Sequence, residues 1–338
     1  MGSSTSRPAA VAAAAAPSPA RIGRPPLHAD IAQLIKSLCR MPALQSVEHG
    51  RTLLDAVQRE AYHPLRLAPA VITSAVVPVD DDVAEGTVSI RVVRALWADP
   101  EGDCLLPALV YVHGACGDFA THERLMRALA DCTGAAVVFV DYARMPDAPW
   151  PAAERQVFGV IAWLAACGDR VGVDGTRLAL VGDGIGAHIA ASAALLAAAD
   201  SDMAPRIHAQ VLVCPILDAP QHLSPDEDKI CLPWTTQDAL ARTWSAYAPD
   251  ATRSPLTAPV SRLRLLPPTL VVTGERDMAA PHGRTYVDAL IRAGAPVQAA
   301  SYADAFHDFW VLDALADTPS ASATTDLVAH FVADAFSR

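Results

Sequence analysis

Leu178-Ala-Leu-Val-Gly182-Asp183-Gly184-Ile185-Gly186-Ala187-His188 is the most informative segment of this chain. It reads as a buried strand, a sharp turn and the start of an alanine-rich helix. A nucleophile elbow has this order, and it needs small residues two before and two after the nucleophile because the neighbouring backbone comes close. Gly182 and Gly186 meet that need. The central residue, Gly184, has no side chain, and phosphate-binding loops contain similar turns. The other segments of the chain must therefore distinguish a nucleophile elbow from a phosphate-binding loop.

Outside this segment the chain repeats the order strand, loop, helix. The expected strands are apolar on both faces, as in a parallel sheet that helices cover on each side. The sequence therefore predicts an α/β fold with a mostly parallel, doubly wound sheet. The expected strands are 71–79, 86–96, 108–112, 135–140, 178–182, 209–213, 269–273 and 297–302, and the expected helices include 121–132, 151–166 and 187–199.

Two regions depart from this alternation. Residues 1–26 are rich in alanine, proline, serine and arginine, which predicts a disordered tail. Residues 27–62 have helical spacing, and residues 216–266 are rich in proline with one helical stretch near 236–247. Long inserts of this kind are usually functional or disordered. We therefore expect one domain over residues 27–338, in which 27–62 and 216–266 form a cap over the ends of the strands.

The composition excludes several classes of function. The net charge of −11 argues against nucleic-acid and anionic-membrane partners, which require a basic surface. No apolar run reaches the roughly 18 residues of a membrane helix, and the seven cysteines contain no CxxC pair. Scattered thiols are typical of a reducing compartment and not of a disulfide framework or a zinc site. We expect a cytoplasmic protein without a metal or cofactor that binds a small-molecule substrate or ligand, with a homodimer allowed.

Three further segments supply chemical groups at the ends of strands. His113-Gly114-Ala115-Cys116 follows a buried strand, and small residues after a His-Gly start let backbone N–H groups point into a site as an oxyanion hole. Asp277 ends the segment Thr273-Gly-Glu-Arg-Asp277, and His307 follows the last strand. The order of nucleophile position, acid and base is therefore 184, 277 and 307, as in hydrolases with a nucleophile elbow.

Together these motifs resemble the hormone-sensitive-lipase group of bacterial esterases over roughly residues 27–338. The family motifs His-Gly-Gly-Gly, Asp-Tyr-Arg-Leu-Ala-Pro-Glu and Gly-Asp-Ser-Ala-Gly-Gly are similar, in that order, to residues 113–116, 141–147 and 182–187. Pro267-Pro268-Thr269 and residues 274–277 complete the match. The resemblance implies an α/β-hydrolase fold with a helical cap, and the hydrolysis of carboxylic esters.

The resemblance also implies roles for individual residues. Asp277 orients His307, and the two act as the acid–base pair of the site. The N–H groups of Gly114, Ala115 and Ile185 form the oxyanion hole. These five residues surround the position at which the family has its nucleophile.

Three more residues are expected at the same pocket, namely His113, Cys116 and Asp183. Asp183 is the usual residue of the family beside the nucleophile, and we expect a structural role for it. Cys116 replaces a family glycine. It is either a replacement nucleophile or a small buried residue, which is the commoner use of cysteine.

Gly184 stands where the family has serine, so ordinary serine-esterase activity is not expected. One hypothesis is a repurposed enzyme in which His307 and Asp277 act as a general base on a water or on a carbon acid of a small carbonyl substrate, in direct hydrolysis or in elimination or cyclisation. A second is a pseudoenzyme that only binds a ligand. A third is an ordinary esterase with an engineered serine-to-glycine change. The retained pair favours the enzyme, because a binding module has no evident use for it.

Overall fold

The computed structural model describes residues 29–59, 67–79, 86–99, 101–148, 150–199, 205–220, 223, 229–248 and 254–338. The expected tail, residues 1–26, lies outside the described residues. So do 27–28 and 60–62 of the expected cap, and 221–222, 224–228 and 249–253 of the expected insert. The expected domain boundary therefore stays a prediction.

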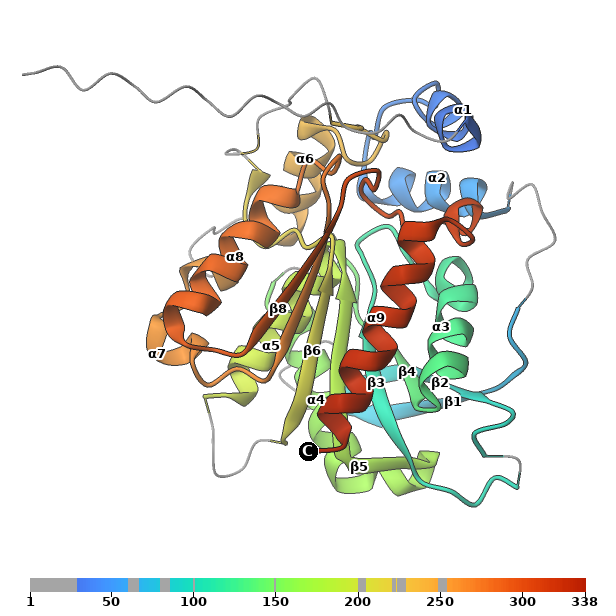
Figure 1. Ribbon diagram of the computed structural model, residues 1–338, viewed down its shortest axis with the longest axis vertical. Helices are drawn as coiled ribbons and strands as arrows, with labels where there is room; N and C mark the ends of the chain where they lie inside the picture. The colour runs from blue at the N-terminus through green and yellow to red at the C-terminus, as the bar shows by residue number, and fades with distance from the viewer. Residues whose placement is uncertain are drawn as a thin grey trace, which may run out of the picture.

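Among the described residues, eight strands form one sheet (Figure 1). They are β1 (Ala70–Pro78), β2 (Thr87–Ala95), β3 (Leu106–Val112), β4 (Ala136–Asp141), β5 (Val173–Asp183), β6 (Ile207–Val213), β7 (Thr269–Gly274) and β8 (Val297–Tyr302). Their order across the sheet is β1-β2-β4-β3-β5-β6-β7-β8. β2 runs antiparallel to both β1 and β4, and the other neighbours are parallel. The prediction of an α/β-hydrolase fold with a mostly parallel sheet is confirmed.

Successive residues of a central strand face opposite sides of the sheet. In β3, Leu109 and Tyr111 belong to one hydrophobic core, whereas Val110 and Val112 belong to the other. All four side chains are fully buried. Helices therefore cover both faces, which explains why these strands read as continuous apolar runs and not as alternating ones.

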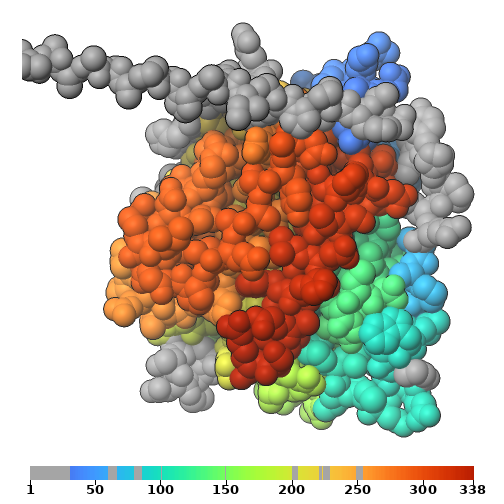
Figure 2. Space-filling model, viewed as in Figure 1, coloured from blue at the N-terminus to red at the C-terminus, as the bar shows by residue number. Residues whose placement is uncertain are grey.

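The core that contains Tyr111 is closed by two helices, α3 (Phe119–Thr133) and α9 (Pro319–Phe336). The core that contains Val110 is closed by three, α4 (Ala152–Cys167), α5 (Gly184–Ala197) and α8 (Ala280–Ala293). In the space-filling view, the orange and red segments from α8 to α9 form most of the front surface (Figure 2). No helix of the described residues is both long and apolar enough to cross a membrane.

Three helices lie beyond the end of the sheet at which β5 leads into α5 (Figure 1). They are α1 (Ala29–Leu38), α2 (Val47–Arg59) and α6 (Gln237–Tyr247). α2 contacts both α3 and α6, and the backbone N–H of Leu44 donates to the carbonyl of Pro233 at 3.3 Å. The described parts of the two expected cap segments thus contact each other at this end of the sheet.

A buried polar cluster fixes α6 to the helices beneath it. The Tyr247 hydroxyl donates to the Glu154 carboxylate, and Nδ1 of His188 lies 2.8 Å from the same hydroxyl. Burial raises the pKa of Glu154 to about 7 and lowers that of His188 to about 3, so the imidazole is neutral. Because Glu154 lies on α4 and His188 on α5, the cluster joins α6 to two helices that cover the sheet through side chains that are all buried.

Candidate active site

The turn between β5 and α5 is as sharp as the sequence pattern predicts. β5 ends at Asp183 and α5 begins at Gly184, with no loop residue between them. A Cβ atom at Gly182 would lie 2.5 Å from the carbonyl oxygen of Gly186, and one at Gly186 would lie closer still to that of Val112. Real Cβ atoms are not found at such distances, so only glycine fits these two positions. This contact is the physical reason for the spacing of the motif.

Gly184, in contrast, has room for a side chain. Its φ of +54° is rare for residues other than glycine, and a strained turn is what presents the nucleophile in an elbow. A Cβ atom there would lie 3.5 Å from Nε2 of His307 and 4.0 Å from the Cα of Gly114, which are ordinary contact distances. A side chain at this position would therefore reach the imidazole ring, and glycine leaves that space open.

Asp277 and His307 lie together beside Gly184. Nδ1 of His307 is 2.9 Å from Oδ2 of Asp277, and both side chains are buried. Asp277 follows β7 and His307 follows β8, and these strands are parallel neighbours, so their carboxyl ends meet. The other oxygen of Asp277 accepts the N–H of Ala279 at 2.8 Å. Both carboxylate oxygens are thus fixed, and the ring is held with Nε2 towards Gly184.

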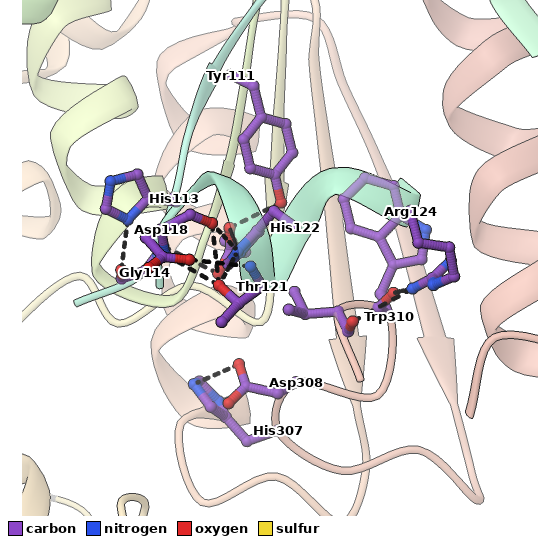
Figure 3. Close-up of polar contacts among 12 residues, drawn as sticks. Tyr111, His113, Gly114, Asp118, Thr121, His122, Arg124, His307, Asp308 and Trp310 are labelled. Atoms are coloured by element: carbon purple, nitrogen blue, oxygen red, sulfur yellow. Dashed lines mark hydrogen bonds and ion pairs between the residues drawn. The ribbon is translucent and has the colours of Figure 1, made fainter. Parts of the chain in front are cut away.

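Two side chains from other parts of the fold hold the loop that carries His307. Arg124 of α3 donates to the carbonyl oxygens of Trp310 and Val311 at 3.0 and 3.2 Å (Figure 3). Gln58 of α2 donates to the same Val311 oxygen at 3.1 Å. The position of the imidazole therefore depends on a helix that covers the sheet and on a helix of the cap.

A second carboxylate, from Asp308, approaches the other ring nitrogen. Oδ1 of Asp308 lies 3.6 Å from Nε2 of His307 (Figure 3). The indole N–H of Trp234 donates to Oδ2 of Asp308 at 2.7 Å. The side chain of Asp308 is only 13% exposed, and its φ of +61° is a conformation that favours glycine and that aspartate tolerates better than most residues. Asp308 is not among the site residues that the sequence motifs predict. The available signal was an acidic side chain directly after the expected catalytic histidine.

The two carboxylates set the charge of His307. Burial alone would lower the pKa of His307, but Asp277 and Asp308 outweigh it and raise that pKa to about 10. Burial raises the pKa of Asp308 above its usual value, and the neighbouring His307 opposes that rise. At neutral pH the ring is therefore an imidazolium between two acids. This differs from the expectation that His307 is the base, because a doubly protonated ring cannot accept a proton.

The expected oxyanion-hole donors do not all face the site. The N–H of Gly114 donates to Oδ2 of Asp183 at 3.1 Å, which corrects its expected place in the oxyanion hole. Within the described part of the chain, the N–H groups of Ala115, Cys116 and Ile185 have no hydrogen-bond acceptor. Ile185 lies in the first turn of α5, where helical N–H groups lack a partner inside the helix. All three residues line the cavity beside Gly184.

The carboxylate of Asp183 contacts several buried groups, as the expectation of a structural role requires. Besides the N–H of Gly114, its carboxylate accepts the hydroxyl of Tyr111 at 2.7 Å, and Nε2 of His122 lies 3.5 Å away (Figure 3). Burial alone raises the pKa of Asp183, but His122 and Tyr111 outweigh it and hold the pKa below the usual value. The carboxylate therefore stays charged and joins the start of α5 to the donor loop after β3.

Replacing Asp183 by alanine should lower the free energy of unfolding by about 3–5 kcal/mol, because the buried groups that contact this carboxylate would lose their charged partner. Asp288→Ala, at an exposed position of α8, is the matched control and should change stability by less than about 0.5 kcal/mol. Urea denaturation followed by circular dichroism measures both. A loss at Asp183 no larger than that of the control would contradict the structural role.

His113 lies behind the cavity and not in its wall, unlike the expectation. Its ring stacks between Tyr142 and Phe139, with centroids 4.4 and 5.0 Å away, and its Nδ1 lies 2.8 Å from the carbonyl oxygen of Gly114. Burial lowers the pKa of His113 to about 3, so the ring is neutral. The Tyr142 hydroxyl donates to the carbonyl of His113 at 2.7 Å. These contacts fix the turn that presents the donor loop.

The surroundings of Cys116 favour a packing role over a nucleophilic one. Burial raises the pKa of the thiol to about 12, whereas reactive cysteines have a lowered pKa because the thiolate is the nucleophile. A Cβ atom at Gly50 of α2 would lie 2.6 Å from Sγ of Cys116. The cap helix therefore provides room for a thiol where the family has glycine.

A small cavity of about 40 Å³ lies over Gly184. On this scale one water needs roughly 10–15 Å³, so the space suits a few waters or a short acyl group. Apolar side chains of the cap, including Leu54 of α2 and Leu240 of α6, close it from above. The other lining residues are Gly114, Ala115, Cys116, Gly117, His122, Asp183, Gly184, Ile185, Ile216, Trp234, Thr243, His307, Asp308 and Val311.

Cys214 adds a third polar atom beside the acid–histidine pair. Its thiol and ligand atoms of Asp277 and His307 lie within 4.8 Å of one another, and all three residues are buried. Burial, and then the charge of Asp277, raise the pKa of the thiol well above its usual value. A metal ion held here would have to replace the hydrogen bond between Asp277 and His307. We therefore assign Cys214 to the packing beneath the pair.

Known proteins resemble this chain in sequence over most of its length. A protein family described as alpha/beta hydrolase fold matches residues 109–311. The chain is 30% identical to the esterase LipI of Mycobacterium tuberculosis over 280 residues, which cover 78% of this chain and 83% of that protein. It is also 30% identical to an ethyl acetate hydrolase of Pseudomonas putida over 228 residues, which cover 63% of this chain and 70% of that protein.

Solved structures of esterases resemble it in fold. A thermostable esterase from Pseudomonas putida aligns with a TM-score of 0.81 at 25% identity, covering 93% of this chain and 99% of that one. An esterase from the hyperthermophilic archaeon Pyrobaculum calidifontis aligns with a TM-score of 0.76 at 26% identity, covering 91% and 98%. The likeness thus includes both the sheet and the helices around it.

Proposed function

The chain belongs to the α/β hydrolase fold family, and we propose on that premise that it is an enzyme that hydrolyses small carboxylic esters without a serine-linked intermediate. The relatives that are named as esterases support this class of substrate. Gly184 excludes the usual nucleophile, because acyl transfer to an enzyme requires a side-chain hydroxyl, thiol or carboxylate at the reacting position. A water molecule therefore attacks the ester carbonyl directly.

The pairing of Asp277 with His307 beside the open Gly184 position carries this proposal. The ring is oriented by a 2.9 Å hydrogen bond, and its Nε2 lies 3.5 Å from the point at which a Cβ atom of residue 184 would stand. A catalytic side chain has to be held within hydrogen-bond reach of the reacting atoms. An imidazole held in this way beside a space the size of a water is suited to proton transfer.

The backbone beside Gly184 supports the same reaction. A water attacking an ester produces a tetrahedral oxyanion, and N–H groups aimed at that oxygen stabilise it. Ala115, Cys116 and Ile185 offer three N–H groups at the cavity, each without an acceptor among the described residues. The cavity of about 40 Å³ limits the acyl part of the substrate to a short chain.

A pseudoenzyme that only binds a ligand is the second candidate, and one observation favours it. Nε2 of His307 faces the carboxylate of Asp308, which holds the ring protonated and would stop it from activating a nucleophile. Such a protein would bind small carbonyl compounds in the cavity without turning them over. Turnover separates this candidate from the enzyme.

Initial rates on p-nitrophenyl esters of increasing acyl length test the proposal. We expect hydrolysis above the buffer rate for the acetate and propionate and a steep fall for longer chains, because the cavity is small. Thermal-shift measurements with the acids and alcohols that these esters would release report binding without turnover. Ligand binding without turnover of any ester would identify the pseudoenzyme and contradict the proposed activity.

Fluorophosphonate probes, which phosphonylate activated serines, should leave this protein unlabelled even while it turns over esters. The probe needs an activated hydroxyl at the elbow, and Gly184 supplies none. Intact mass spectrometry after prolonged exposure measures this, with an ordinary serine esterase as the positive control. Stoichiometric labelling that maps to a cavity residue would show that another side chain is the nucleophile.

A further inference from the structure

Asp308 places a carboxylate on the wall of the cavity. Burying a carboxylate is unfavourable unless the charge is paired and hydrogen-bonded. Residues other than glycine in the left-handed region carry backbone strain, which persists where the surrounding structure imposes it and is found often at functional sites. Asp308 combines both features at φ +61°, adjacent to His307 and on the wall of the cavity.

The contacts of Asp308 leave one oxygen available. The indole N–H of Trp234 holds Oδ2 at 2.7 Å, which fixes the orientation of the carboxylate. Oδ1 lies 3.6 Å from Nε2 of His307, beyond the range of a direct hydrogen bond between nitrogen and oxygen. This oxygen therefore lies near the imidazolium without a hydrogen bond to it, so its lone pairs can still accept a proton.

Asp308 lines the same cavity as the open position at residue 184 and does not fill that position. The three atoms nearest to a Cβ atom there belong to His307 and Gly114, the farthest of them at 4.0 Å. Both the carboxylate and the imidazolium line the same small cavity as Gly184. A water in this cavity would thus have a donor, the Nε2–H of His307, beside the open position and an acceptor, Asp308, on the wall of the same cavity.

We propose that Asp308 is the catalytic base of this enzyme. Its carboxylate deprotonates the attacking water, so the reaction needs no serine nucleophile. The assignment rests on the proposed ester hydrolysis. The water oxygen forms a bond to the carbonyl carbon while one water proton passes to Oδ1 of Asp308, and the carbonyl electron pair moves to the oxyanion.

Collapse of this intermediate completes the reaction. The oxyanion re-forms the carbonyl, the bond to the alcohol oxygen breaks, and that oxygen takes the proton from Nε2 of His307. Transfer of the proton from Asp308 to His307 then restores the starting state. Ester and water become acid and alcohol, with no side chain acylated, and Asp277 keeps the ring oriented throughout.

Asp308→Asn and Asp308→Gly test the assignment together. Asparagine keeps the shape of the side chain and an oxygen for the Trp234 indole, whereas glycine suits the positive φ, so one variant covers a folding failure of the other. Asp317→Asn, at an exposed position of the same segment, is the matched control. We measure kcat and KM for p-nitrophenyl acetate, the melting temperature, and the protonation of His307 by nitrogen-15 NMR.

Both Asp308 variants should lose at least ~10²-fold in kcat with little change in KM, since general-base catalysis contributes typically 10²–10⁴-fold. The NMR spectrum should show that His307 loses its second proton at a lower pH in these variants than in the unmodified protein, because one of the charges that raise its pKa is gone. If their kcat equals or exceeds that of the unmodified protein while His307→Ala abolishes turnover, His307 is the base and the assignment of Asp308 is wrong, although ester hydrolysis stands. If the unmodified protein and His307→Ala hydrolyse esters equally, the proposed function fails and the Asp308 assignment fails with it.

Discussion

Gly184→Ser should raise the rate of p-nitrophenyl acetate hydrolysis at least ~10-fold at pH 8. In the double variant that also carries Asp308→Gly, the serine-dependent rate should rise by up to a further factor of about 100. The first step restores a hydroxyl within reach of His307, because a Cβ atom at residue 184 stands 3.5 Å from Nε2. Loss of a triad nucleophile costs roughly 10⁶-fold in rate, which sets the upper limit of the gain.

Two effects reduce the gain of the single variant below that limit. With the pKa of His307 at about 10, roughly one ring in a hundred is neutral at pH 8 and able to deprotonate the serine. Ala115 and Cys116 stand where the family has glycines, and a displacement of the N–H donors by about 1 Å costs about 10²-fold. Removing Asp308 lowers the pKa of His307 and lifts the first restriction, which explains why the double variant should be faster.

Gly184→Ala is the matched control, because it adds the Cβ atom without the hydroxyl. It should stay unreactive towards fluorophosphonates. Gly184→Ser, alone or combined with Asp308→Gly, should be labelled at the serine introduced at position 184. His307→Ala added to Gly184→Ser should remove the gain. A serine variant that folds but hydrolyses esters no faster than Gly184→Ala would show that this turn no longer presents a nucleophile to His307.

His307→Ala in the otherwise unmodified protein should lower kcat/KM for short esters at least ~10³-fold. The imidazolium donates the proton to the leaving alcohol and balances the charge of Asp308, so its loss removes acid catalysis and disturbs the base. Asp277→Asn should lower the rate severely as well, because the carboxylate sets the orientation and tautomer of the ring. Both changes are measured by steady-state kinetics on the same ester.

Stability has to be followed in the same samples. Without His307, Asp277 and Asp308 remain buried without the cation between them, which is unfavourable. His330→Ala, at an exposed position of α9, is the control and should change neither rate nor melting temperature. Ester hydrolysis that survives His307→Ala in a folded protein would place the chemistry elsewhere in the fold.

The pH dependence of stability should reflect the same ring. Because the pKa of His307 in the folded protein is raised to about 10, above its usual value of about 6.5, the folded state holds its proton more tightly than the unfolded state. The stabilisation is fully present below about pH 6.5 and is lost as the pH rises towards 10. Urea unfolding across this range should show the loss, and His307→Ala should reduce it.

The main features of the fold and part of the site follow from local rules in the sequence. The roles of Gly182 and Gly186 can be predicted from the sequence, because backbone atoms occupy the space that a Cβ atom would need and no other residue fits there. The doubly buried strands are readable because both faces need apolar side chains. Asp277 and His307 are readable because residues after parallel neighbouring strands meet at one edge of the sheet.

Other features depend on partners that are far away in the sequence. The N–H of Gly114 is taken by Asp183, 69 residues later, so the motif alone could not exclude Gly114 from the oxyanion hole. Asp308 is oriented by its own backbone angle and by Trp234, 74 residues earlier in the cap insert. A residue beside a catalytic histidine can point into the cavity or away from it, and only the folded chain decides which.

A single-turnover experiment with excess protein over p-nitrophenyl acetate tests the central claim most directly, that this site hydrolyses esters by direct attack of water beside Gly184. After rapid quenching, absorbance measures nitrophenol, chromatography measures acetate, and intact mass spectrometry measures any acetylated protein at each time. We predict that nitrophenol and acetate appear with the same rate constant, that no acetylated protein accumulates, and that His307→Ala removes the reaction. Nitrophenol that appears ahead of acetate with an acetylated protein, or no reaction beyond that of His307→Ala, would contradict the account.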